Sequence, residues 1–173
     1  MWLSDRSRRR RRRRLLALLP AAAVSALAAG CNFKLRQPPK LAFETIALLG
    51  FAPRSPLADE LKRQLLQQVR VIDAPDKAQI VLHALTDMRE KSVVASTSAA
   101  QVRELQLRLK FHFRADTPGG RALIPRVEML LKRDLSYSES QALAKEVEEA
   151  ELFREMQADV VAQVLRRLAA VRV

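Results

Sequence analysis

The stretch Glu104-Leu105-Gln106-Leu107-Arg108-Leu109-Lys110-Phe111-His112-Phe113-Arg114 alternates between apolar and polar side chains. Successive side chains of a β-strand point to opposite faces of a sheet, so this period of two predicts a strand with one dry face and one wet, cationic face. No other stretch has so regular a pattern, and the neighbouring elements are predicted outward from it. The dry face holds Leu105, Leu107, Leu109, Phe111 and Phe113.

Hairpin signals flank this strand on both sides. After it, Thr117-Pro118-Gly119-Gly120 supplies turn residues, and a partner strand is expected from about Arg121 to Tyr137. Pro125 cannot donate to a strand ladder, so it marks an edge or a bulge. Before the strand, residues 89–100 lose hydrophobicity and gain serine and threonine. This composition is typical of two strand ends joined by an exposed hairpin loop.

The preceding segment combines a strand, a helix and a second strand. Residues 41–50 are mostly apolar and predict a buried strand, and residues 78–88 predict the returning one. Between them, Ser55-Pro56 has the form of a helix N-cap followed by proline at the first helical position. This order favours a parallel βαβ crossover, and a longer loop would allow an antiparallel return instead. The helix should run for about four turns with one apolar stripe of Leu57, Leu61, Leu65 and Val69.

Residues 138–171 predict a long amphipathic helix that is interrupted near its start. Acidic residues crowd its first half and arginines its last turns, the arrangement that the helix dipole favours. Apolar residues recur at spacings of three or four along it, namely Leu143, Val147, Ala150, Phe153, Met156, Val160, Val164, Leu168 and Val171.

The N-terminal segment has the three parts of a secretory leader. Arg6 and the block Arg8 to Arg14 are basic, residues 15–28 are apolar, and Ala29-Gly30 are small. The residue after the expected cleavage site, Cys31, predicts a bacterial lipoprotein, in which the thiol receives diacylglycerol and becomes the new N-terminus. We therefore expect a signal peptide over residues 1–30, a lipidated tether over residues 31–40 and one α+β domain over residues 41–173.

Other interpretations of this segment explain less of it. The arginine block also fits a nucleic-acid-binding arm, but such an arm leaves the adjacent apolar segment and the cysteine unexplained, so no nucleic-acid partner is expected. The apolar segment is shorter than the roughly 20 residues of a transmembrane helix. Export by the general or the twin-arginine route stays open. In lipoproteins that resemble those of Gram-negative enterobacteria, an aspartate after the cysteine favours retention in the inner membrane. Asn32 stands at this position, so the resemblance implies the periplasmic side of the outer membrane.

No pattern in the chain indicates catalysis or a cofactor. The only histidines, His83 and His112, lie on different predicted strands, and no further cysteine exists beside Cys31 to complete a metal site. No Gly-x-Ser-x-Gly elbow and no phosphate-binding glycine loop occur. The formal charge is +12, and the eight arginines before Cys31 account for much of it. We expect a mildly basic, non-enzymatic domain whose one attached group is the lipid on Cys31.

Basic residues gather on the wet face of the central strand and on its expected partner. Two interpretations remain open: a solvated sheet face kept soluble by charge, or a docking surface for a phosphate-bearing glycolipid or an acidic protein wall. The residues concerned are Arg108, Lys110, Arg114, Arg126, Lys132 and Arg133, with Arg89, Lys91 and Arg103 near the opposite loop.

Two motifs resemble the lipopolysaccharide-assembly lipoproteins of the LptE family. Cys31-Asn32-Phe33-Lys34-Leu35-Arg36 resembles the family's Cys-Gly-aromatic-basic-Leu-Arg opening, and Ser140-Gln141-Ala142-Leu143-Ala144-Lys145-Glu146 is similar to the family's approach to its last helix. The resemblance covers the mature chain. It implies an α+β fold with two helices packed on one face of a four-stranded mixed or antiparallel sheet, in the order β-α-β-β-β-α.

The resemblance also implies a role and a ligand. The family member would sit as a plug inside the outer-membrane β-barrel protein LptD, help to assemble it, and assist the delivery of lipopolysaccharide to the outer leaflet. The residues expected to contact lipopolysaccharide are Arg89, Lys91 and Arg103 near the loop and Lys145 before the last helix. The alternatives are an auxiliary or binding lipoprotein of another envelope transport system and a cell-wall hydrolase, which would need an acid/base pair in a cleft.

Overall fold

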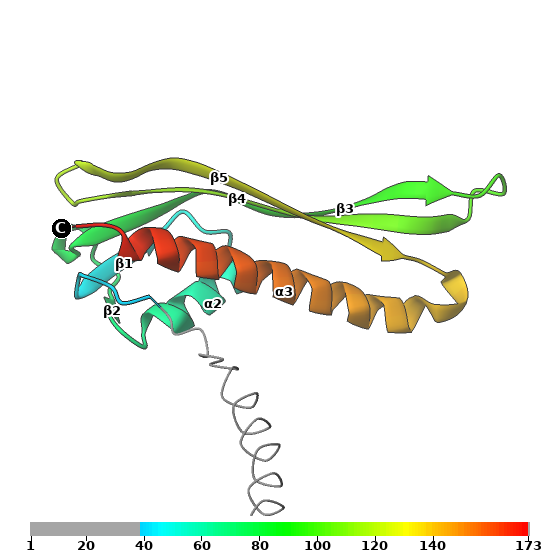
Figure 1. Ribbon diagram of the computed structural model, residues 1–173, viewed down its shortest axis with the longest axis horizontal. Helices are drawn as coiled ribbons and strands as arrows, with labels where there is room; N and C mark the ends of the chain where they lie inside the picture. Colours follow the sequence, from blue (N-terminus) through cyan, green and yellow to red (C-terminus); the bar gives the residue numbers. More distant parts are fainter. Residues whose placement is uncertain (1–38, 173) are drawn as a thin grey trace, which may run out of the picture. The chain divides into compact units, whose positions relative to one another are not determined.

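The computed structural model describes residues 39–172, so Cys31, the predicted signal peptide and most of the predicted tether lie outside the described residues. A mixed five-stranded sheet with the order β2-β1-β3-β4-β5 carries two helices on one face (Figure 1). The strands are β1 (Thr45–Leu49), β2 (Arg70–Val71), β3 (Ile80–Ser96), β4 (Val102–Asp116) and β5 (Ala122–Ser136). The helices are α2 (Pro56–Leu65) and α3 (Ala142–Ala169), with short 3₁₀ turns η1 (Pro75–Lys77) and η2 (Glu139–Gln141).

The antiparallel half of the sheet follows the prediction closely. β4 pairs with β3 on one side and with β5 on the other, and all five predicted apolar residues of its dry face are buried. The predicted loop over residues 89–100 consists of the end of β3 and a hairpin turn. Both hairpin turns are built alike, because the hydroxyls of Thr97 and Thr117 each accept a hydrogen bond from the backbone N–H four residues later.

Pro125 lies on β5, an edge strand, where the pairing with β4 shifts register between Phe113 and Ala115. The predicted edge or bulge is therefore confirmed. The shift also changes which side chain enters the core, because Ile124 is buried and its neighbour Leu123 is only half-buried.

The parallel half of the sheet confirms the βαβ crossover. β1 pairs in parallel with β3 from Ile46 opposite Ile80 to Leu49 opposite His83, and the hydroxyl of Ser55 caps α2 by accepting from the N–H of Ala58 at 3.1 Å.

Two predictions for this half were wrong. α2 ends at Leu65, short of the expected four turns, and the sheet has five strands where four were expected. Both differences have one cause: Arg70 and Val71 leave the helical path and pair with Thr45 and Ile46 as β2.

The main core lies between the helix-facing side of the sheet and the two helices. It joins Leu57, Leu61 and Leu65 of α2 to the apolar stripe of α3 and to the dry face of β4. The stripe on α3 is buried only from Phe153 onward, because Leu143 and Val147 are 77% and 68% exposed. In those first turns the side chains that reach the sheet are polar: Lys145 bonds Ser136 and Glu149 bonds Lys91.

Gly50, which follows β1, is expected to be the glycine least tolerant of substitution. Its φ is +78°, and a Cβ there would overlap the backbone carbonyl oxygen of Ala84 on β3. We expect Gly50→Ala to lower the free energy of unfolding by about 2–5 kcal/mol, because left-handed strain costs about 1–2 kcal/mol and a forced backbone shift about 1–3 kcal/mol. Urea denaturation followed by circular dichroism measures the difference.

Two other glycines separate these contributions. Gly120 has φ +83° with open space around it, so Gly120→Ala should cost only the strain, about 1–2 kcal/mol. Gly119 has neither feature, and Gly119→Ala should be close to neutral. If all three Gly→Ala variants lost the same free energy of unfolding, this would contradict the close approach of Gly50 to β3.

Candidate functional site

A β-bulge at Leu85 decides which side chains of β3 face the helices. Ala84 pairs with Phe113, but Thr86 pairs with His112, so Leu85 is the extra residue and is left 45% exposed. A bulge shifts the alternation of a strand by one residue. Beyond it, Arg89 and Lys91 pair with Leu109 and Leu107 and therefore share the helix-facing side of the sheet with the buried face of β4.

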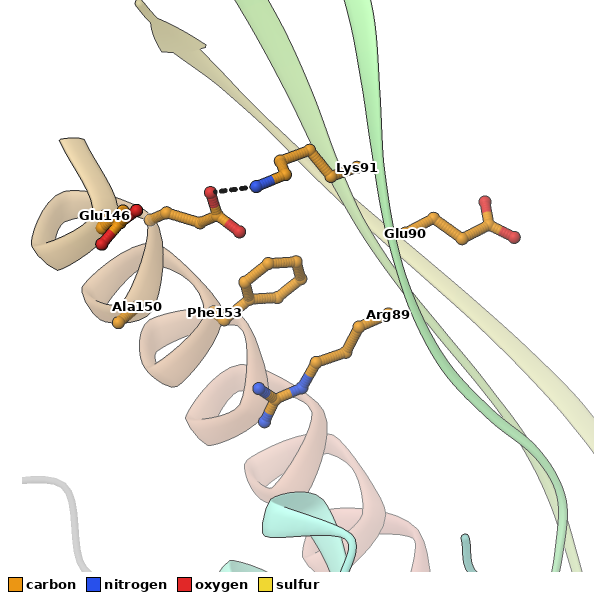
Figure 2. A pocket seen from close by; sticks show the side chains of 7 residues that line it. Arg89, Glu90, Lys91, Glu146, Ala150 and Phe153 are labelled. Atoms are coloured by element: carbon orange, nitrogen blue, oxygen red, sulfur yellow. Dashed lines mark hydrogen bonds and ion pairs between the residues drawn. The ribbon is translucent and has the colours of Figure 1, made fainter. Parts of the chain in front are cut away.

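Arg89 and Lys91 project from β3 toward α3, whereas Glu90 projects to the other side (Figure 2). The Nζ of Lys91 lies 2.8 Å from a carboxylate oxygen of Glu149. The guanidinium carbon of Arg89 lies 5.2 Å from the ring centroid of Phe153, within the range of a cation–π contact. No carboxylate among the described residues lies within ion-pairing distance of Arg89. Two of the four residues expected to contact lipopolysaccharide thus meet in one groove.

This β3–α3 groove consists of two adjoining cavities of about 530 and 560 Å³ that share Arg89 and Ala150. The first contains the Lys91–Glu149 pair. The second reaches α2 and is lined by Arg63, Arg154 and Gln157 among others. Gln157 is only 6% exposed, and its side-chain amide nitrogen is buried without a hydrogen-bond partner. An unpaired buried donor is costly, so this atom marks a place where a ligand can add an acceptor.

The sequence analysis missed Phe153 and Gln157 as members of a site. Phe153 was assigned to the core stripe of the last helix, where it is indeed buried. Gln157 follows it by four residues and therefore falls on the same stripe. A glutamine on an otherwise apolar stripe was the available signal.

The other two expected contact residues lie outside the groove, next to the end of β5. Lys145 bonds the hydroxyl of Ser136 on β5 at 3.2 Å and Glu148 at 2.8 Å, and its side chain is 14% exposed. The backbone carbonyl of Arg103 accepts from the N–H of Tyr137 at 2.8 Å, and its side chain is exposed. Arg89 and Lys91 therefore lie in the groove, whereas Lys145 and Arg103 lie outside it, next to Ser136 and Tyr137.

Exposed apolar side chains accompany these cations. Leu143 and Val147 of α3 and Val93 and Val94 of β3 are between 47% and 77% exposed. The end of the domain that holds the first turns of α3 and the β3–β4 turn thus combines basic and apolar groups, called here the amphipathic end.

The wet face of the sheet is less cationic than the sequence suggested. Lys110 pairs with Glu90 at 2.7 Å and Arg126 with Glu128 at 2.8 Å. Arg133 belongs to the opposite face, since it pairs with Asp159 of α3 at 3.5 Å. No helix covers the wet face of β3–β5 within residues 39–172.

The histidines stay apart. Nε2 of His83 lies 3.8 Å from a carboxylate oxygen of Asp116, and Nδ1 of His112 lies 3.5 Å from a guanidinium nitrogen of Arg126. In the part of the chain that the structure describes, no three His, Cys, Asp or Glu residues gather in a way that could hold a metal ion. No helix of that part is long and apolar enough to cross a membrane.

Comparison with known proteins gives consistent matches. The family model described as LptE, lipopolysaccharide-assembly, matches residues 43–168. The solution structure of an uncharacterized lipoprotein B from Nitrosomonas europaea is 29% identical with a TM-score of 0.68, over 80% of this chain and 91% of that one. The crystal structure of the rare lipoprotein B from Shewanella oneidensis is 25% identical with a TM-score of 0.60, over 73% and 95%.

A minor lipoprotein from Acinetobacter baumannii, 21% identical with a TM-score of 0.60 over 75% and 93% of the chains, shares the fold. A search of curated protein sequences gives no match.

Proposed function

This chain belongs to the LptE family of lipopolysaccharide-assembly proteins, and from that membership we propose that it plugs the outer-membrane barrel LptD and helps lipopolysaccharide to reach the outer leaflet. The observation that carries the proposal is that the family match spans β1 to α3 and so includes every major element of the fold. The relatives named as lipoproteins make it a lipoprotein of the cell envelope. We also propose that lipid on Cys31 anchors the protein to the periplasmic side of the outer membrane.

The wet face of β3–β5 is the surface proposed to meet the barrel. This face carries no helix and is largely polar, with ion pairs such as Lys110–Glu90 across neighbouring strands and with Met88 and Leu130 as exposed apolar residues. The inner wall of a large barrel is polar, so a rigid, polar sheet face suits it better than an apolar one. The role is one of binding and positioning, with no catalytic step.

The amphipathic end is the surface proposed to meet lipopolysaccharide. Its cations, Lys91, Arg103 and Lys145, suit the phosphates of a glycolipid, because charge-assisted hydrogen bonds to phosphate are strong. Arg89 lies farther along α3, against Phe153. Its exposed apolar residues suit acyl chains, because burial of apolar surface is favourable. One surface that offers both kinds of contact favours an amphiphile over a free anion.

A detergent pull-down from outer membranes through a C-terminal tag tests the proposal. We expect a large β-barrel protein and lipopolysaccharide to be recovered with the wild-type chain. Recovery of an inner-membrane permease in place of the barrel would instead indicate an auxiliary lipoprotein of another transport system and would end the plug hypothesis.

The same pull-down tests the lipopolysaccharide contact. Arg103→Glu reverses an exposed charge at the amphipathic end, and we expect about tenfold less lipopolysaccharide per barrel, the effect of one lost charge-assisted contact. Arg121→Glu is the matched control, because Arg121 is equally exposed but lies next to the β4–β5 turn. Equal losses for both variants would show that net charge, and not the position of Arg103, governs binding.

A further inference from the structure

β3 has an open edge beyond its pairing with β1. The parallel pairing stops at His83, and no described residue pairs with the remaining length of β3 on that side. From Ala84 to Ser96 alternate residues therefore present backbone N–H and C=O groups without a strand partner. Such an edge is a template for an added strand.

The open edge borders the β3–α3 groove. Side chains of a strand added next to β3 would alternate, and the one opposite Arg89 would point to the same face as Arg89, with Cβ atoms about 5 Å apart. That position lies over the cavity lined by Arg63, Arg154 and Gln157. An added strand would therefore place one of its side chains in this cavity.

The groups around this cavity select an acidic side chain. Arg63 and Arg154 each pair with a glutamate of their own helix, Glu60 and Glu151, and Glu60 also lines the cavity. Arg89 contacts the ring of Phe153 and forms no ion pair with a described carboxylate, although Asp87 lies on the same face of β3. The buried amide nitrogen of Gln157 donates to nothing within residues 39–172. A carboxylate can accept from this amide and from Arg89 at once.

The same charges disfavour a second copy of this chain as the occupant. Two open edges paired antiparallel about Arg89 would place the two Arg89 side chains directly opposite each other on the face that also carries Asp87 and Lys91. Like charges opposite each other on neighbouring strands repel, and inward-pointing charges on an edge strand are a known protection against self-pairing.

We propose that the open edge of β3 takes up an extended segment of the barrel partner as an additional strand, with an aspartate or glutamate of that segment held by Arg89 and Gln157. This inference rests on the proposed function, since the barrel is the partner. It adds a specific contact that neither the wet sheet face nor the amphipathic end provides.

Hydrogen exchange tests the added strand. In the wild-type complex, alternate backbone amides of residues 86–96 should exchange at least about a hundredfold more slowly than in the free lipoprotein, because added-strand hydrogen bonds protect them. A complex that contains the barrel but leaves these amides as fast as in the free chain overturns the inference and leaves the proposed function standing. If no barrel protein is recovered with the lipoprotein, both the added strand and the proposed function are contradicted. Protection in the free chain together with a dimeric mass by light scattering identifies a second copy as the occupant and also overturns it.

Substitution of Gln157 tests the acidic side chain. Gln157→Leu removes the unpaired buried donor, so the melting temperature should hold or rise, while recovery of the barrel falls about tenfold through loss of a hydrogen bond to a charged group. If Gln157 had only a structural role, the melting temperature and the recovery of the barrel would change together. Gln163→Leu on the same helix, outside the groove, is the matched control and should leave recovery unchanged. Unchanged recovery with Gln157→Leu contradicts the assignment of the carboxylate.

Discussion

Replacement of Phe111 by alanine is expected to remove a large share of the stability of the domain. Phe111 is 0% exposed at the centre of β4, and its ring stacks on Phe51 at 5.7 Å and on Phe113 at 5.6 Å between centroids. Loss of a buried phenylalanine side chain costs about 3–5 kcal/mol, to which the lost aromatic pairs contribute about 0.5–1.5 kcal/mol each. Domains of this size have a total of about 5–15 kcal/mol.

Chemical denaturation of the mature protein, followed by circular dichroism, measures this loss. Leu130→Ala is the matched control, because Leu130 lies two strands from β3 on the wet face and is 50% exposed. Its free energy of unfolding should change by no more than about 0.5 kcal/mol. Similar losses for the two variants would mean that the dry face of β4 is not the centre of the core.

Cys31→Ser is expected to abolish attachment of the protein to the outer membrane. A serine hydroxyl does not replace the thiol that is alkylated, so the chain should carry no fatty acid. Each acyl chain contributes about 0.8 kcal/mol per buried methylene, and stable anchoring takes about two chains. A chain without acyl groups should therefore lose its membrane attachment completely. Incorporation of labelled palmitate and the mass of the N-terminal peptide are the measurements.

Asn32→Asp tests lipidation and membrane localisation separately. This variant keeps Cys31, so labelled palmitate should still be incorporated, but the protein should fractionate with the inner membrane. A Cys31→Ser protein found in the outer membrane at the wild-type level would overturn the lipoprotein anchor, whatever the behaviour of the Asn32 variant.

Much of the fold was predictable because its signals are local. The alternation of Leu105 to Phe113, the cap at Ser55 and the proline at position 125 each depend on backbone geometry within a few residues, and each is confirmed. β2 was missed because two residues carry no periodicity. Their pairing depends on Thr45 and Ile46, which lie some 25 positions earlier in the chain.

The candidate site was predictable only in part. Arg89, Lys91, Arg103 and Lys145 were singled out from a family resemblance, and the structure places Arg89 and Lys91 in the β3–α3 groove and Lys145 and Arg103 next to the end of β5. Lys91 turned out to be paired with Glu149, and the partnerless amide of Gln157 could not be foreseen. Burial and pairing of a polar group depend on which elements meet, and a single sequence does not specify that.

The amino-acid sequence alone determined the strand–helix–strand start, the two hairpins and the long final helix, because turn residues, caps and hydrophobic periods act over short distances. The tertiary structure decided on which face of the sheet each β3 side chain beyond Ala84 lies. Without the extra residue Leu85, simple alternation from Ala84 would put Met88 toward the helices and Arg89 on the wet face. With it, Arg89 and Lys91 face α3 and Met88 is 50% exposed on the other side. A bulge shifts the alternation of one strand against its neighbour, so only the pairing of β3 with β4 could decide where the groove and its charges lie.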